Sequence, residues 1–144
     1  MKRLLLVVLA LIAASPALAQ GPVVEFRPGA GNLGPFSEAV RVDGLLFLSG
    51  MIGNDSTGQV VKGGIAAETR QTLENIKAAL ARNGVGMDRV VKCTVFLADI
   101  GEWGAMNEVY RTYFTTNKPA RSALGNATLV RNARVEIECI AAAR

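Results

Sequence analysis

The stretch "VVKCTVFLAD", residues 90–99, decides the fold that this sequence predicts. Its residues alternate as in a β-strand, and the apolar set at every second position is Val91, Cys93, Val95 and Leu97. The segment "TVFL" also carries apolar side chains on both parities, as strands do when both faces of their sheet are covered. We therefore expect a strand in a sheet that helices cover on one face and a partner chain covers on the other.

A helical pattern precedes this strand, in "IAAETRQTLENIKAALARNG", residues 65–84. Apolar and small residues recur there at helical spacing, and Asn83-Gly84 is a common helix end. The expected buried stripe consists of Ile65, Thr69, Leu73 or Thr72, Ile76 and Leu80.

A second helix is expected directly after the strand. Asp99 and Glu102 have the spacing of a capping box, with Asp99 as the N-cap. The helix then runs to about residue 114, and its apolar face carries Trp103, Met106, Tyr110 and Phe114.

The rest of the chain supplies strands. Residues 23–26 form a short edge strand, residues 39–50 form a hairpin that turns at Asp43-Gly44, and residues 121–129 and 134–142 form the last two strands. The order β-β-β-α-β-α-β-β predicts an α+β sandwich with two helices packed on one face of a mixed or antiparallel sheet. Because apolar residues occupy both parities of some strands, we expect an oligomer.

Residues 1–19 have the three parts of a secretory signal peptide. Lys2 and Arg3 precede an apolar run at 4–14, and Ala17-Leu18-Ala19 forms a cleavage site. The run is shorter than the roughly 20 residues of a membrane-spanning helix. We therefore expect export, a periplasmic location, and one domain at residues 20–144 without membrane contact after cleavage.

Composition excludes several kinds of site and partner. The chain has 16 Lys and Arg against 12 Asp and Glu, and loss of the leader would lower the net charge from +4 to +2. Because no basic run with stacking aromatics is present, we expect no nucleic-acid partner. The absence of His removes Ser-His-Asp triads, Cys-His pairs and nearly all catalytic zinc sites, so we expect no metal.

The two cysteines, Cys93 and Cys139, each lie on the apolar parity of a predicted strand. An exported protein can form a disulfide, but the distance between the two Cα atoms that the bond requires cannot be obtained from the sequence. We favour two buried thiols, because free Cys often behaves as a small core residue.

Arg121 lies among small side chains in "KPARSALGNATL", residues 118–129. It is either a solvated arginine at a strand end or a bidentate clamp for a carboxylate, which its planar fork suits. The small neighbours favour the clamp, because a ligand needs space.

Three other places carry polar groups that suit a site. Glu136 and Glu138 share the face opposite the apolar set of their strand, and are either solvated or desolvated by a neighbouring subunit. Asn107 lies on the apolar face of the second helix, where a packing hydrogen bond is the simpler explanation. Ser49-Gly50 ends a strand, and Gly50 either allows a close approach or forms a bulge.

Taken together these segments resemble the Rid family of reactive intermediate deaminases, of the YjgF type. The matching stretches are "GPFSEAVRVDGLLFLSG", "TRQTLENIKAALARNG", "VVKCTVFLADI", "MNEVYRTYF", "PARSAL" and "VEIECIA". The resemblance implies a chorismate-mutase-like α+β fold and a homotrimer with clefts between subunits. It also implies hydrolysis of 2-imino acids and their enamine tautomers to 2-oxo acids and ammonia, without cofactor or metal.

The resemblance also implies roles for particular residues. Arg121 would hold the substrate carboxylate, and Glu136 would order the attacking water and help move a proton to the leaving amine. The substrate-binding set would comprise Arg121, Ala123, Gly50, Ser49, Asn107 and Phe36.

The chain departs from the common family pattern at three positions. Ala123 replaces a frequent Cys, Phe36 a frequent Tyr, and Met51 a frequent Gln, which makes the expected cleft more apolar. The alternative function is a non-catalytic trimer that holds a small carboxylate or a partner segment in the same cleft.

Overall fold

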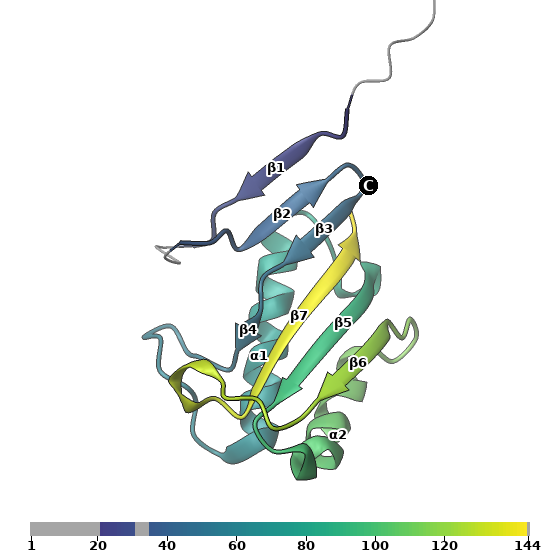
Figure 1. Cartoon of the computed structure of the whole chain (residues 1–144). Coiled ribbons are helices and arrows are strands. Elements are labelled where there is room, and N and C mark those ends of the chain that lie inside the picture. Colours follow the sequence, from purple (N-terminus) through teal and green to yellow (C-terminus); the bar gives the residue numbers. More distant parts are fainter. Residues whose placement is uncertain (1–20, 31–34, 144) are drawn as a thin grey trace, which may run out of the picture.

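A computed structural model describes residues 21–30 and 35–143 (Figure 1). The strands of this part are β1 (Val24–Arg27), β2 (Ala39–Val42), β3 (Leu45–Leu48), β4 (Met51–Ile52), β5 (Val90–Leu97), β6 (Ala120–Leu124) and β7 (Val135–Ala142). The α-helices are α1 (Gly64–Arg82) and α2 (Trp103–Tyr113). Short 3-10 helices lie at η1 (Met87–Arg89), η2 (Ile100–Glu102) and η3 (Val130–Asn132). The expected signal peptide at residues 1–19 lies outside the described residues.

All seven strands belong to one mixed sheet with the order β1-β2-β3-β7-β5-β6, and β4 pairs with the first part of β7. The β5–β6 pair is parallel, with α2 as its crossover, whereas the other pairs are antiparallel. Both helices lie on the same face of the sheet (Figure 1). The predicted α+β sandwich is therefore confirmed, with the two-residue β4 as an addition that was too short to recognise in the sequence.

The core lies between this sheet face and the helices. The predicted stripe of α1 is buried there: Ile65, Thr69, Thr72, Leu73, Ile76 and Leu80. The helix ends near Asn83, and Gly84 has a φ of 70°, which glycine adopts without a steric penalty. On α2, Met106 and Tyr110 are buried as expected, while Trp103 remains 42% exposed. In the part of the chain that the structure covers, neither helix is long and apolar enough to cross a membrane.

The strand β5 contains a bulge. The register between β5 and β7 shifts between Val90 and Lys92, so Val90 is buried and Val91 is 45% exposed. The expectation that Val91 belongs to the apolar set is therefore wrong. After the bulge, Val95 and Leu97 face the core as expected.

The capping box is also only half correct. The side chain of Asp99 accepts a hydrogen bond from the backbone N–H of Gly101 at 2.8 Å and so caps η2, which leads into α2. The carboxylate of Glu102 does not reach back to the cap; it forms an ion pair with Arg134 at 2.5 Å instead. Arg134 lies just before β7, so this pair ties the entry of α2 to the sheet.

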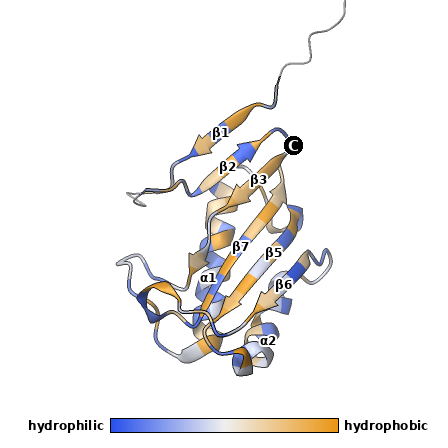
Figure 2. Cartoon of the chain, in the orientation of Figure 1, coloured by the Kyte–Doolittle hydropathy of each residue, from blue (hydrophilic) through white to orange (hydrophobic). Residues whose placement is uncertain are grey.

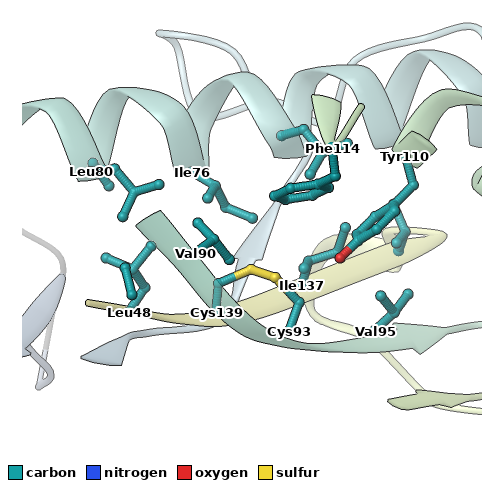
Figure 3. Close-up of a cluster of buried hydrophobic side chains, with 14 of the residues drawn as sticks. Leu48, Ile76, Leu80, Val90, Cys93, Val95, Tyr110, Phe114, Ile137 and Cys139 are labelled. Carbon is teal, nitrogen blue, oxygen red and sulfur yellow. A yellow bond between two sulfur atoms is a disulfide. The ribbon is translucent and has the colours of Figure 1, made fainter. Parts of the chain in front are cut away.

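Cys93 and Cys139 form a disulfide, which corrects the expectation of two free thiols. They are direct partners in the β5–β7 register, and their Cα atoms are 4.1 Å apart. Figure 3 shows the bond within the cluster of buried hydrophobic side chains. The strand parity placed both residues in the core, but the register of two strands 46 residues apart is a tertiary property that the sequence does not provide.

The sheet face without helices, here called the open face, carries exposed apolar side chains. Leu45 and Phe47 on β3 are 42% and 39% exposed, while their neighbours Leu46 and Leu48 point into the core. Figure 2 shows that the ribbon of β3 is coloured as hydrophobic along its length, as expected for a strand with apolar residues on both faces. The pattern agrees with a sheet whose second face is covered in an assembly.

Candidate functional site

Arg121 on β6 is oriented by α2. Its register partner on β5 is Cys93, so its side chain extends to the helix face. The guanidinium donates a hydrogen bond from Nη1 to Oδ1 of Asn107 at 2.9 Å. It also lies over the rings of Tyr110 at 4.5 Å and Trp103 at 5.6 Å, measured from Cζ to the ring centroids. Three residues of one helix therefore fix the position of this cation.

The guanidinium of Arg121 keeps its capacity to bind an anion. Among the described residues no ion pair includes it, and Asn107 accepts one of its five N–H donors. A half-buried arginine that is held by an amide and two aromatic rings is prepared for a planar carboxylate. Burial raises the pKa of Tyr110 to about 12 against the opposing effect of Arg121, so the ring beneath the guanidinium stays neutral.

A pocket of about 390 Å³ opens beside Arg121, between α2 and the segment that leads into β6. Its lining residues are Asn107, Tyr110, Arg111, Phe114, Lys118, Pro119 and Arg121. Two residues of the predicted site, Arg121 and Asn107, are thus brought to one pocket.

Glu136 on β7 lies elsewhere, on the open face, next to Gly50. A Cβ atom at Gly50 would lie 2.1 Å from Oε1 of Glu136, so the absence of a side chain at Gly50 gives this carboxylate its position. Partial burial, and secondarily the charge of Glu138, raise the pKa of Glu136 above its usual range. A carboxylate with a raised pKa is a better proton acceptor near neutral pH than an ordinary one.

The other predicted residues lie around these two centres. Ser49 donates its hydroxyl hydrogen to the carbonyl of Ser37 at 2.7 Å and so fixes the strand end that precedes Gly50. Phe36, next to Ser37, is 56% exposed. Ala123 lies two residues beyond Arg121 and packs partly against the core.

Within one chain, Arg121 and Glu136 do not meet. Glu136 is in register with Phe96, and Phe96 with Leu124, so these three side chains share the open face. Arg121 is an odd number of residues from Leu124 on the same strand and therefore points to the helix face. Leu124 is three residues from Arg121, and β6 is two strands from β7. These offsets amount to roughly 10 Å along the strands and roughly 10 Å across them. The chain thus presents two half-sites, one around Arg121 and one around Glu136.

Sequence reasoning missed several parts of these half-sites. Trp103 and Tyr110 were assigned to the core face of α2, yet they also stack on Arg121. Their spacing around Asn107 on one helix face was the available signal. Lys118 and Arg111 line the pocket, and nothing in their sequence context distinguished them from solvated cations. Over residues 21–30 and 35–143, no group of three or more Cys, Asp or Glu is arranged to hold a metal ion.

Comparison with known proteins identifies the family of this chain. The sequence profile of the family described as Endoribonuclease L-PSP matches residues 28–143. A mouse protein named 2-iminobutanoate/2-iminopropanoate deaminase is 47% identical over 120 residues, which cover 83% of this chain and 89% of the mouse protein.

Solved structures show the same fold. The YjgF gene product of E. coli superposes with a TM-score of 0.74 at 34% identity, over 82% of this chain and 94% of that one. The protein YyfA of Yersinia pestis, described as a member of the conserved Rid protein family, has a TM-score of 0.77 at 37% identity, over 83% of this chain and 99% of that one. The chain therefore belongs to the family described as Endoribonuclease L-PSP, which is the Rid, or YjgF, family.

Proposed function

We propose that this protein hydrolyses the C=N bond of small 2-imino acids and their enamine tautomers, which yields 2-oxo acids and ammonia. The observation that carries the proposal is the guanidinium of Arg121, which Asn107 and two aromatic rings hold without an ion-pair partner among the described residues. Relatives that carry the name 2-iminobutanoate/2-iminopropanoate deaminase support the reaction, since they are 44–48% identical over 83% of this chain.

Arg121 binds the carboxylate that every 2-imino acid carries next to its C=N carbon. Two parallel N–H···O bonds fix the orientation of the substrate as well as its position. The C=N carbon is already electrophilic, so correct placement of water contributes most of the required acceleration.

Glu136 supplies the proton transfer in this mechanism. Its carboxylate accepts a proton from water while the water oxygen bonds to the C=N carbon. The same proton then passes to the nitrogen, which gives a carbinolamine. Glu136 next takes the hydroxyl proton of the carbinolamine and delivers it to the nitrogen, so the C–N bond breaks and ammonia leaves as the C=O bond forms. One water is consumed for each ammonia released, and the carboxylate is regenerated.

We propose further that the two half-sites meet between subunits of a homotrimer. Arg121 and Asn107 of one protomer would face Glu136, Gly50 and Phe36 of the next. The support lies in the opposite sheet faces of Arg121 and Glu136 and in the exposed apolar side chains of the open face. An interface over that face removes both apolar area and the carboxylate of Glu136 from water.

The direct test follows imine decay with purified protein. An amino-acid oxidase generates 2-iminopropanoate or 2-iminobutanoate in situ, and semicarbazide traps whatever imine remains. We expect the protein to divert imine to 2-oxo acid and to lower the trapping rate in proportion to its concentration. Decay no faster than in buffer for either imine contradicts the proposal. Tight binding of 2-oxobutanoate without such acceleration would identify the non-catalytic alternative.

We propose that the protein is exported and works outside the cytoplasm. The sequence of residues 1–19 supports this, and so does the Cys93–Cys139 disulfide, because such bonds persist in oxidising compartments. Mass spectrometry of the periplasmic fraction should find a mature N-terminus at Gln20. An intact Met1, or recovery in the membrane pellet, would refute export.

A further inference from the structure

We propose that the pocket beside Arg121 selects dicarboxylic 2-imino acids, with Lys118 binding the distal carboxylate. This inference rests on the proposed deaminase function and specifies its substrate class. It arises from the charges around the pocket, which exceed what a monocarboxylic imino acid needs.

The pocket has three cations and no carboxylate in its lining. Arg111, Lys118 and Arg121 contribute the positive charges. Arg111 is partly neutralised, because its Nη2 lies 2.8 Å from Oε2 of Glu108. Neither Lys118 nor Arg121 takes part in an ion pair with another described residue. Like charges around one concavity repel each other, so an occupant with two negative charges is favoured over one with a single charge.

The lining of the pocket also has an apolar part. Tyr110 and Phe114 form it, and their ring centroids are 4.7 Å apart at the buried side of α2. Arg121 stands over the Tyr110 ring, and Lys118 enters from the segment before β6. A methylene chain therefore finds aromatic surface while its two carboxylates find cations.

The size of the pocket agrees with this substrate class. Its volume is about 390 Å³, within the range of small-ligand sites, whereas a three-carbon imino acid would occupy only the part next to Arg121. Lys118 is exposed, and its flexible stem carries a compact ammonium that can follow carboxylates at different distances. We therefore expect both 2-iminosuccinate and 2-iminoglutarate to fit.

The test compares the ratio of kcat/KM for 2-iminosuccinate to that for 2-iminopropanoate in the full mature protein. The parent should prefer the dicarboxylate. Lys118→Met keeps the stem but removes the charge, and should lower the ratio about five- to tenfold, equivalent to ~1–1.4 kcal/mol at 1.36 kcal/mol per tenfold. Lys62→Met is the matched control, because it removes the same charge from an exposed lysine that lies outside the pocket lining.

A second arm measures binding and does not depend on catalysis. Isothermal titration calorimetry compares 2-oxoglutarate with 2-oxobutanoate, and the preference for the dicarboxylate should shrink in Lys118→Met and at high salt. If the parent protein hydrolyses 2-iminopropanoate but shows no preference for the dicarboxylate, the proposed function stands and this inference is overturned. An equal change for both acids in Lys118→Met also overturns it, because that result reflects general attraction of anions. If the parent protein hydrolyses neither imine but keeps the binding preference that depends on Lys118, the proposed deaminase function is wrong and the assignment of the pocket is supported.

Discussion

The guanidinium of Arg121 has two requirements, a fixed plane and an accessible edge. Asn107 and the rings of Tyr110 and Trp103 provide the first, and the pocket provides the second. Lysine satisfies neither, because its ammonium is a point charge without a planar pair of donors.

Arg121→Lys should therefore lower kcat/KM on 2-iminobutanoate by about 30- to 1000-fold, from ~2–4 kcal/mol for a truncated charge pair. Steady-state kinetics measures the loss, and circular dichroism verifies the fold. Arg70→Lys, the same exchange at an exposed position on α1, should keep parental activity. A lysine variant as active as the parent would contradict the clamp.

Gly50 is a positioning residue for Glu136. Gly50→Ala places a methyl group where Oε1 of Glu136 now lies, and the flexible end of that side chain must move. We expect kcat to fall at least tenfold while the melting temperature stays within a few degrees, because the clash displaces a side-chain end rather than backbone. Gly104→Ala on α2 meets no atom within 4 Å and should leave kcat unchanged. An unchanged kcat in Gly50→Ala would show that the position of Glu136 does not matter for the reaction.

Because its pKa is raised, Glu136 should set the pH at which kcat/KM falls on the acid side of the pH profile. Burial and the charge of Glu138 favour the neutral form, so protonation of Glu136 removes the proton acceptor at a higher pH than for an ordinary glutamate. Glu138→Gln removes one of these causes and should lower the pKa of Glu136. The acid limb of the kcat/KM profile should then move to lower pH, whereas Asp88→Asn, at an exposed position on η1, should not move it. A shift to higher pH in Glu138→Gln would refute this assignment.

At the scale of elements, the β5–α2–β6 crossover brings the Arg121 half-site together. The parallel pairing of β5 and β6 requires a crossover, and α2 supplies Trp103, Asn107 and Tyr110 from one face. The disulfide fixes β5 to β7 directly beneath this unit, since Cys93 is the register partner of both Arg121 and Cys139.

Reduction of the disulfide should lower the free energy of unfolding by about 2–4 kcal/mol, because the bond closes a long loop in the unfolded chain. Urea unfolding with and without a thiol reductant, at one protomer concentration, measures the difference. The double variant Cys93→Ala/Cys139→Ala should lose all dependence on reductant. Equal midpoints for the parent in both conditions would show that the bond does not contribute.

For the whole molecule, the proposal is that each active site of the trimer takes residues from two protomers. A mixture of inactive Arg121→Ala and Glu136→Gln proteins should regain activity after their subunits exchange. Random mixing leaves about a quarter of the interfaces with both native residues. Failure to regain activity in mixed trimers would contradict a site that two subunits share.

In the proposed trimer, the open face of the sheet forms the interface. Phe47→Glu places a charge among exposed apolar side chains and should convert the trimer into folded, inactive protomers, as light scattering and kinetics would show. Val130→Glu is the control, because Val130 is 64% exposed on η3, outside the strands. A trimer that survives Phe47→Glu would place the interface elsewhere.

The sequence by itself determined the elements and the parity of their side chains. Local periodicity predicts the α1 stripe, the strand that holds Glu136 opposite Val135 and Ile137, and the helix that precedes Arg121, because backbone hydrogen bonding in a helix or strand repeats over a few residues. The family motifs came from the same local stretches. These features required no knowledge of which strands pair.

Only the tertiary structure decided which distant residues meet. Four features depend on register across the sheet and on helix packing. They are the bulge at Val91, the bond between Cys93 and Cys139, the contact of Gly50 with Glu136, and the pocket that includes Lys118. Register is set by the summed burial of many side chains from separate segments, so no single segment encodes it. The family resemblance implied that Arg121 and Glu136 act together, but only the pairing of β5, β6 and β7 placed them on opposite faces of the sheet.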